Sequence, residues 1–235
     1  MRWLTRQLKG LSLNSRLIVF ATRRLAYLST ALRSGVSAAD IHQVEHTTKR
    51  DRYPDVFEAA RSYFESTGKQ PSKILSFGCS TGDECFTLRT YFADSFIVGA
   101  DINKGSLSIA ESQRNDKNIK FVASTASYLA ELGPFDAIFA MSVLCRWPET
   151  KFLRDSSAIY PFDKFSKTIA LLDSCLSPEG LFVIVNANYR LNDAICGYTI
   201  VRISDRNDWI PKFDTNNKRI EKSENAEGEF IFKKN

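Results

Sequence analysis

The residue pattern with the clearest chemistry joins a glycine turn to an acid nineteen residues further along the chain. The turn, residues 78–82, reads Gly-Cys-Ser-Thr-Gly and follows an apolar run over residues 73–77, while Asp101 closes a second apolar run that begins at Phe96. Glycine at both ends of a turn lets a ligand approach the main chain, and an acid at the end of the next strand can accept hydrogen bonds from both hydroxyl groups of a ribose. The pattern therefore predicts a site for the adenosine half of a nucleotide-like cofactor. The alternative is that Asp101 caps a helix that begins near Lys104.

Two acids at the exit of the turn narrow the choice of cofactor. Asp83 and Glu84 directly follow Gly82, where a helix over residues 84–91 is expected to begin. Carboxylates suit a helix N-terminus and also an ammonium group, but they would repel the pyrophosphate that binds at this position in a dinucleotide site. The sequence therefore favours S-adenosylmethionine, whose methionine part carries an ammonium group, over NAD.

Buried strands that alternate with helices would place these residues beside one another, so the predicted fold class is α/β. The short apolar runs at residues 73–77 and 96–101 are typical of central parallel strands. Near the end of the chain, residues 198–203 and 228–233 alternate between apolar and polar side chains and predict two further strands. A polar insertion over residues 204–226 separates them.

The order of strand, glycine turn, helix and strand ending on an acid resembles class I S-adenosylmethionine-dependent methyltransferases. The resemblance covers about residues 70–190, because residues 119–122, 135–141 and 176–185 look like the third, fourth and fifth strands of that family. It implies a Rossmann-like fold with a mostly parallel seven-stranded sheet and helices on both faces. The turn with its two acids is most similar to the chemotaxis-receptor (CheR-type) methyltransferases, whose loop reads Gly-Cys-Ser-Thr-Gly-Glu-Glu.

The resemblance also implies where the cofactor binds. The family often places an acid after the third strand to meet the adenine, and here Thr125 with the backbone of Ala126 takes that position. Upstream, Thr48 and Arg52 match a threonine and an arginine that touch the cofactor in the chemotaxis enzymes. Arg52 can bind the methionine carboxylate through two parallel hydrogen bonds, or it simply precedes a helix with Pro54 in its first turn. The predicted cofactor-binding residues are Arg52, Phe77, Gly78, Cys79, Ser80, Thr81, Gly82, Glu84, Asp101, Ile102, Thr125, Ala126 and Met141.

Polar and aromatic residues also gather where acceptors bind in such a fold, beyond the carboxyl ends of the strands. They lie in a loop over residues 156–162 and in residues 186–190, directly after the fifth strand. Tyr160 and Tyr189 are the predicted catalytic residues, on the condition that their pKa is lowered. The predicted acceptor-binding residues are Arg146, Asn188 and Arg190. The alternative is that these side chains form hydrogen bonds within loops, with the tyrosines packed on the sheet.

Residues 1–39 carry the positive charge of the chain. They contain seven Lys and Arg residues and no acid, so the other 196 residues have a net charge of −2 within the total of +5. Apolar residues recur at helical spacing here, which predicts a basic amphipathic arm over residues 1–50, ahead of a methyltransferase domain over residues 51–235. The arm could cap the domain, contact a membrane surface or an acidic partner, or act as a transit peptide. The near-neutral body disfavours a nucleic-acid partner.

Cysteine and histidine usage indicates the compartment and argues against a metal site. Five dispersed cysteines, odd in number, are typical of a reducing compartment, so the protein is expected to be cytoplasmic. Residues 42–46 match the His-x-x-Glu-His string of one class of zinc peptidases. These are the only two histidines in the chain and no further ligand is marked, so no metal is predicted.

The predicted function is transfer of a methyl group from S-adenosylmethionine to an oxygen or nitrogen atom of a small molecule or a protein. Such a reaction depends mainly on alignment of the acceptor with the methyl group, so no catalytic triad is expected. Two alternatives remain open. One is a non-catalytic S-adenosylmethionine-binding module that docks on a membrane or a protein partner, and the other is a CheR-like protein-glutamate O-methyltransferase.

Overall fold

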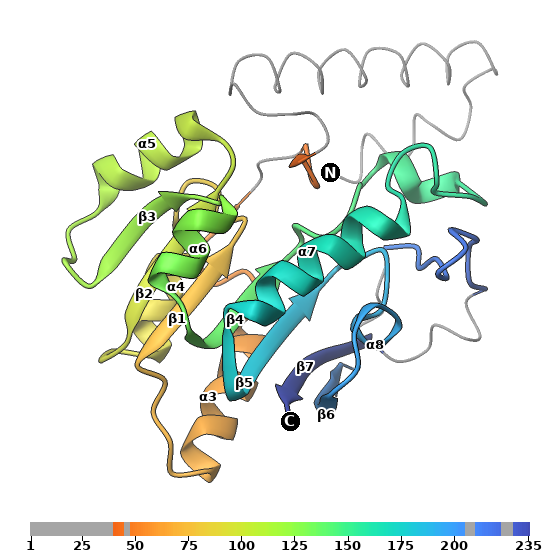
Figure 1. Cartoon of the computed structure of the whole chain (residues 1–235). Coiled ribbons are helices and arrows are strands. Elements are labelled where there is room, and N and C mark those ends of the chain that lie inside the picture. The colour runs from red at the N-terminus through yellow and green to blue at the C-terminus, as the bar shows by residue number, and fades with distance from the viewer. Residues whose placement is uncertain (1–39, 45–47, 205–209, 222–227) are drawn as a thin grey trace.

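The computed structural model describes residues 40–44, 48–204, 210–221 and 228–235. They contain one seven-stranded sheet with the strand order β3-β2-β1-β4-β5-β7-β6 (Figure 1). The strands are β1 (Lys73–Phe77), β2 (Phe96–Asp101), β3 (Ile119–Ala123), β4 (Phe135–Met141), β5 (Leu176–Val185), β6 (Tyr198–Ser204) and β7 (Gly228–Lys234). Strands β1 to β5 run parallel, and β7 lies antiparallel between β5 and β6. This confirms the predicted Rossmann-like class I methyltransferase fold.

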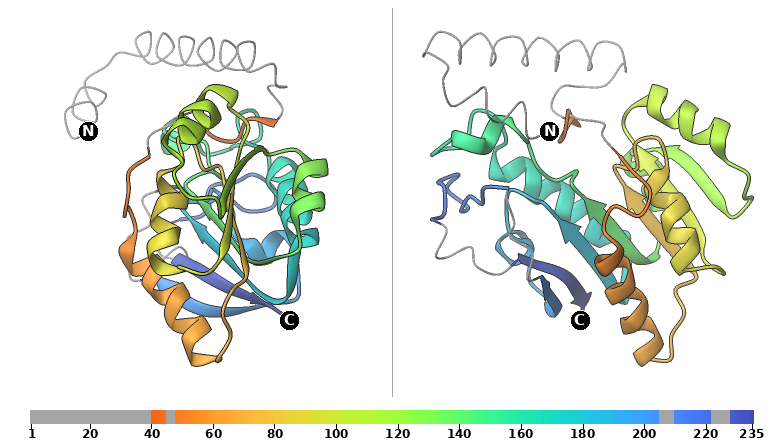
Figure 2. Two further views of the ribbon diagram at one scale, coloured as in Figure 1. Left: turned by 90° about the vertical axis from the view of Figure 1, so that its left-hand side faces the viewer. Right: turned by 180° about the vertical axis from the view of Figure 1, so that it is seen from behind.

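Helices cover both faces of the sheet, as the edge-on view in Figure 2 shows. The helices are α3 (Pro54–Ser66), α4 (Asp83–Tyr91), α5 (Lys104–Gln113), α6 (Ala126–Leu132), α7 (Phe162–Ser174) and α8 (Leu191–Ala194), with a 3₁₀ turn η3 (Glu149–Phe152). Helices α3 and α4 contribute to the core on one face, and α6 and α7 contribute to the core on the other.

The central strands are apolar on both sides because both sides are covered. In β4, Phe139 belongs to the core under α3 and α4, while Ile138 and Ala140 belong to the core under α7. Each of these three side chains is fully buried. Burial on both faces explains why the central strands are nearly continuous apolar runs rather than alternating ones.

The chain changes direction across the sheet between β1 and β4. Strand β2 follows β1 on one side, whereas β4 returns to pair with β1 on the other. Ligands of open parallel sheets bind at the carboxyl ends of the strands at such a point. Here these ends lead directly into Gly78, Asp101 and Ser142.

Both predicted tail strands are confirmed as β6 and β7. The described part of the predicted insertion, residues 210–221, packs on the domain and does not stand free. Phe213 is fully buried in the core, and the Lys212 ammonium group donates to the Ala187 carbonyl at 2.7 Å.

Residues 1–39 of the predicted arm, and with them its basic charge, lie outside the described residues. Residues 40–44 pack against the sheet domain, because Ile41 is buried and its carbonyl accepts from Lys164 at 2.6 Å. These residues of the predicted arm therefore contact the sheet domain, and the boundary at residue 50 stays a prediction. Among the described residues, no helix is both long and apolar enough to cross a membrane.

Candidate functional site

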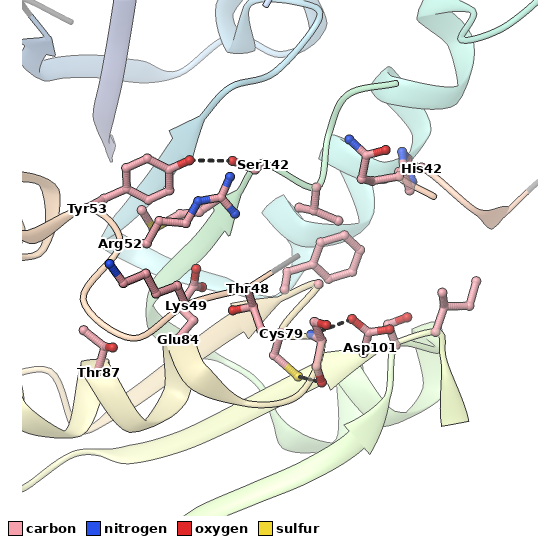
Figure 3. Close-up of a pocket in the computed structure, with 18 of the residues that line it drawn as sticks. His42, Thr48, Lys49, Arg52, Tyr53, Cys79, Glu84, Thr87, Asp101 and Ser142 are labelled. Atoms are coloured by element: carbon pink, nitrogen blue, oxygen red, sulfur yellow. Dashed lines mark hydrogen bonds between the residues drawn. The ribbon is translucent and has the colours of Figure 1, made fainter. Parts of the chain in front are cut away.

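A pocket opens at the carboxyl ends of β1, β2 and β4 and encloses about 900 Å³ of empty space including its mouth (Figure 3). Residues from the glycine turn, from the ends of β2 and β4 and from the chain before α3 line it. The lining residues are Asp40, His42, Gln43, Thr48, Lys49, Arg52, Tyr53, Phe57, Phe77, Gly78, Cys79, Ser80, Glu84, Thr87, Asp101, Ile102, Ser124, Met141, Ser142 and Val143. Most of the predicted cofactor residues are among them.

The glycine turn has the backbone geometry that its sequence predicts. Gly78 has a φ of 79°, and a Cβ atom placed on it would lie 2.4 Å from a methyl group of Val143. The amides of Gly78 and Cys79 donate to the Ala100 carbonyl at 2.8 and 3.1 Å. These hydrogen bonds attach the turn to β2, and Gly78 packs closely against Val143 in the loop after β4.

Thr81 and Gly82 lie in the turn but are not among the pocket-lining residues. Gly82 has a φ of 89° and directly precedes α4. A Cβ atom there would lie 2.8 Å from the ring of Phe121. The second glycine therefore permits close packing between turn and sheet, whereas the sequence predicted close approach of a ligand.

Asp101 is buried and holds the turn from the side of β2. Its carboxylate accepts from the Ser80 amide at 2.7 Å through one oxygen and from the Asn103 amide at 2.8 Å through the other. Asn103, not Asp101, caps α5 through a bond from the Ser106 amide at 3.1 Å. The alternative role of Asp101 as a helix cap is therefore wrong. Since each carboxylate oxygen has two lone pairs, Asp101 keeps the capacity to bind ligand hydroxyl groups.

Glu84 and Arg52 line another part of the pocket. Glu84 accepts from the Ser76 hydroxyl at 2.8 Å, and desolvation by the surrounding protein raises the pKa of its carboxyl group to about 8, against the opposing effects of Ser76 and Arg52. The Arg52 guanidinium lies 5.0 Å from the centre of the Tyr53 ring. A desolvated acid beside a cation at the pocket wall fits a ligand that carries both an ammonium group and a carboxylate, as methionine does.

Thr125 and Ala126, which were predicted to meet the adenine, lie just outside the pocket lining. Thr125 is exposed and caps α6 by accepting from the Tyr128 amide at 3.4 Å, and Ala126 begins that helix. Neither residue lines the pocket, but the preceding Ser124 does. A threonine before a helix is as good a cap as it is a ligand contact, so the sequence pattern did not separate the two roles.

The predicted catalytic role of Tyr160 and Tyr189 requires correction. Both side chains are buried in the core and neither lines the pocket. The Tyr189 hydroxyl donates to the Tyr160 carbonyl at 2.5 Å. Burial raises the pKa of Tyr189 to about 12 and that of Tyr160 well above its ordinary value. A base needs the opposite shift, so these tyrosines stabilise the core beneath the site.

The three predicted acceptor-binding residues are likewise not among the pocket-lining residues. The Arg146 amide donates to Asn188 at 2.7 Å, and the side-chain amide of Asn188 donates to the Pro211 carbonyl at 2.8 Å. The Arg146 guanidinium donates to the His42 carbonyl at 3.1 Å. Arg190 directly precedes α8. Arg146 and Asn188 therefore join loops and the upstream segment instead of facing the pocket.

His42 is a pocket-lining residue that the sequence did not assign to the site. Its Nδ1 lies 2.6 Å from the Tyr160 hydroxyl and its Nε2 lies 2.9 Å from the Thr168 hydroxyl. Burial, assisted by Lys164 and Arg146, lowers the pKa of His42 to about 3, so the ring is neutral. Glu45 and His46 of the zinc-like string lie outside the described residues.

Tyr53, Ser142 and Asn186 form a further polar group that was not predicted. The Tyr53 and Ser142 oxygens are 2.9 Å apart, and the Asn186 side-chain amide donates to both at 2.9 and 2.8 Å. Tyr53 and Ser142 line the pocket. The place of Ser142 directly after an apolar strand was a usable sequence signal, but Tyr53 reaches the pocket only through the tertiary fold.

These features of the pocket agree with the comparison against protein families. The methyltransferase domain family matches residues 69–228, more than half of the chain. The chain belongs to this family. Membership agrees with the predicted class of enzyme, a methyltransferase. The closer resemblance to chemotaxis-receptor methyltransferases stays a prediction from the glycine turn.

Solved structures similar to this chain are also methyltransferases. N-methyltransferase NodS from Bradyrhizobium japonicum WM9, in complex with S-adenosyl-L-homocysteine, is 17% identical over 68% of this chain and 71% of that chain, with a TM-score of 0.44. A S-adenosylmethionine-dependent methyltransferase from Clostridium acetobutylicum ATCC 824 is 16% identical over 70% of this chain and 56% of that one, with a TM-score of 0.42. The plantazolicin methyltransferase BpumL is 18% identical over 55% of this chain, with a TM-score of 0.42, and the match spans 44% of its length. Curated proteins gave no match.

Proposed function

We propose that this protein transfers a methyl group from S-adenosylmethionine to an oxygen or nitrogen atom of a small-molecule or protein acceptor. The observation that carries the proposal is the placement of Asp101 and the Arg52–Glu84 pair in one pocket, at opposite sides of the glycine turn. Asp101, which suits ribose hydroxyls, is thus on one side of the turn. Arg52 and Glu84, which suit a zwitterionic amino acid, are on the other.

Each of these residues has a distinct role in holding the cofactor. Asp101 would bind the ribose hydroxyls, Glu84 the ammonium group and Arg52 the carboxylate. Ile102 and Ser124 lie beyond the ends of β2 and β3 and would flank the adenine. Cys79 of the glycine turn lies between Glu84 and Asp101 in Figure 3.

When bound, S-adenosylmethionine would supply a methyl group on its sulfonium sulfur. The acceptor lone pair would attack the methyl carbon, the carbon–sulfur bonding pair would stay on the sulfur, and the acceptor would lose its O–H or N–H proton to solvent. The protein contributes alignment and exclusion of water. Residues 40–43 serve the second purpose, since Arg146, Lys164 and Tyr160 hold this segment against the pocket rim. His42 is neutral and has both ring nitrogens engaged, so we assign it to the wall and not to proton transfer.

Thermal unfolding of the full chain with S-adenosylmethionine, S-adenosylhomocysteine, NAD and ATP, each titrated separately, tests the cofactor assignment. A ligand at about 100 times its dissociation constant adds roughly 2.7 kcal/mol to the free energy of unfolding. At this chain length, that corresponds to a rise of about 5–10 °C in melting temperature. We expect the rise with the two S-adenosyl compounds alone. A rise with NAD alone, or with none of the four, would overturn the proposal.

Turnover needs a second measurement, because binding alone does not separate an enzyme from a non-catalytic module. Release of S-adenosylhomocysteine should be followed with candidate acceptors that present hydroxyl, amine or protein side-chain groups. Acceptor-dependent release would establish catalysis. Tight cofactor binding without release for any acceptor class would favour the module that docks on a membrane or protein partner.

A further inference from the structure

Tyr53, Ser142 and Asn186 meet from three separate parts of the chain. Tyr53 directly precedes α3, Ser142 directly follows β4 and Asn186 directly follows β5. Their three mutual distances are 2.8 to 2.9 Å, so the side chains form a closed hydrogen-bonded triangle. A buried network of this kind fixes the position of each oxygen because moving one member would break bonds to the other two.

The backbone also fixes the two strand-end residues. Ser142 has a φ of 60° and Asn186 a φ of 57°, in the left-handed region that non-glycine residues seldom occupy. The Ser142 amide donates to the Val185 carbonyl at 2.7 Å, which continues the pairing of β4 with β5 past the strand end. Strained residues held by their surroundings concentrate at functional sites. Here the left-handed backbone goes with Ser142 and Asn186 side chains that meet Tyr53 at the carboxyl ends of β4 and β5.

The three residues of the triangle differ in their access to the pocket. Tyr53 and Ser142 line the pocket, whereas Asn186 does not and is buried. Figure 3 shows Tyr53 and Ser142 beside Arg52 and across the pocket from Asp101. Asn186 therefore holds two oxygens that face the space between the proposed ribose and methionine contacts.

The sulfonium of S-adenosylmethionine connects its ribose to its methionine part. With the ribose at Asp101 and the carboxylate at Arg52, that sulfur must lie between these residues. We therefore infer that the oxygens of Tyr53 and Ser142 face the transferred methyl group and the attacking atom of the acceptor, and that Asn186 is the positioning residue that holds them. This inference rests on the proposed function.

The chemistry of the triangle fits this role. A hydroxyl oxygen accepts weak hydrogen bonds from the polarised C–H groups of a methyl sulfonium. It also accepts an N–H or O–H bond from an acceptor and so turns a lone pair of that acceptor toward the methyl carbon. The oxygens are neutral and fixed, so they suit an amine or hydroxyl acceptor and need little reorganisation when it binds.

Sinefungin tests the inference without knowledge of the acceptor. In this analogue a carbon atom replaces the sulfonium sulfur, and an amine on that carbon replaces the methyl group. S-adenosylhomocysteine has neither the methyl group nor an amine at this position. The ratio of their dissociation constants on the full chain, measured by calorimetry, therefore reports hydrogen-bond acceptors at the transfer position. We expect sinefungin to bind about tenfold more tightly than S-adenosylhomocysteine, as charged hydrogen bonds predict.

Tyr53→Phe and Ser142→Ala should each reduce this preference by about threefold to tenfold and leave S-adenosylhomocysteine affinity within about twofold. Asn186→Leu should reduce the preference as well, since it releases both oxygens. Ser112→Ala removes an exposed hydroxyl that donates to the Ile109 carbonyl and does not line the pocket. It is the matched control, so its ratio should equal that of the wild type.

The affinity for S-adenosylhomocysteine shows that each variant is folded. An unchanged ratio in both Tyr53→Phe and Ser142→Ala, with normal S-adenosylhomocysteine binding, would overturn the inference. An equal loss for both compounds would also overturn it, because the oxygens would then contact a part that the two ligands share. If the wild type binds neither compound, the proposed function itself fails and the inference falls with it.

Discussion

Asp101 is the residue on which the ribose contact depends, and it has a second task. Its carboxylate accepts from the Ser80 and Asn103 amides, so it also fixes the glycine turn. We predict that Asp101→Ala weakens binding of S-adenosylhomocysteine tenfold or more, because loss of charged hydrogen bonds costs about 1.5–3 kcal/mol. Calorimetric titration measures the change.

Asp94→Asn is a suitable control for Asp101→Ala, since Asp94 is exposed and removal of its charge alters the net charge equally. Its affinity should match that of the wild type. Equal affinity in Asp101→Ala and the wild type would show that the ribose does not bind at the end of β2.

Glu84 should make both stability and binding depend on pH. Burial raises its pKa in the folded protein to about 8, whereas an unfolded chain titrates near 4.3. Between these values the folded state holds a proton that the unfolded state has lost, so the free energy of unfolding falls as pH rises and levels off above about 8. Glu84→Gln should remove this part of the pH dependence, which urea unfolding at several pH values will show.

The titration of Glu84 also predicts whether the affinity for S-adenosylhomocysteine rises or falls with pH. An ammonium group beside Glu84 stabilises its charged form and lowers its pKa, so binding of S-adenosylhomocysteine should release a proton below pH 8. Affinity should therefore rise from about pH 6 to about pH 8. Calorimetry in buffers of different ionisation enthalpy counts the released protons. Equal proton release by the wild type and Glu84→Gln would contradict the assignment of the ammonium site.

At the scale of elements, the glycine turn offers a test of its close contact with the loop after β4. Gly78 and Gly68 both have positive φ, but a Cβ atom on Gly78 would collide with Val143, whereas one on Gly68 would meet nothing within 4 Å. Gly68→Ala should cost only the conformational strain, about 1 kcal/mol. Gly78→Ala should cost about 1–3 kcal/mol more, from overpacking. Urea unfolding compares the two, and equal costs would show that the contact with Val143 is not tight.

The elements that sequence could predict are those whose signal is local. The path from β1 through the glycine turn and α4 to Asp101 lies within thirty residues, so its apolar runs, glycines and acid stand close together in the sequence. Tyr53 and His42 carry no such signal. They reach the pocket through partners 89 and 118 residues away in the sequence, and no periodicity records that distance.

The mistaken assignments have a common cause at this scale. Tyr160, Asn188 and Tyr189 lie at the carboxyl end of the sheet, where polar residues suggest a ligand. Asn188 and Tyr189 take partners from residues 211–217, since Asn188 binds Pro211 and Tyr189 binds Asn217. The Tyr160 hydroxyl instead lies 2.6 Å from His42 Nδ1. Polar residues at a strand end thus bind either a ligand or a second loop. Which of the two they bind depends on where the described part of the insertion, residues 210–221, packs.

At the scale of the whole molecule, the pocket is built from two parts of the chain. The sheet supplies the turn, the acids and the strand ends, and residues 40–43 and 48–53 supply the opposite wall. Two cations join the two parts, since Arg146 donates to the His42 carbonyl and Lys164 to the Ile41 carbonyl. The pocket therefore needs the upstream segment from Asp40 onward.

Two truncated chains test this division. A chain that begins at residue 40 keeps every described residue of the pocket wall, so we predict that it binds S-adenosylhomocysteine within about twofold of the full chain. A chain that begins at residue 48 loses Ile41 and His42 and leaves Tyr160, Arg146 and Lys164 without these buried partners. Its free energy of unfolding should fall by about 2–5 kcal/mol, and its affinity should fall too.

Calorimetry and urea unfolding on both truncated chains distinguish the outcomes. Loss of affinity on removal of residues 1–39 alone would show that the basic arm contributes to the site. Retained affinity and stability in the chain that begins at residue 48 would show that the contacts of Ile41 and His42 are dispensable. The expected result assigns the cofactor site to residues 40–235, and residues 1–39 then remain available for a membrane surface or an acidic partner.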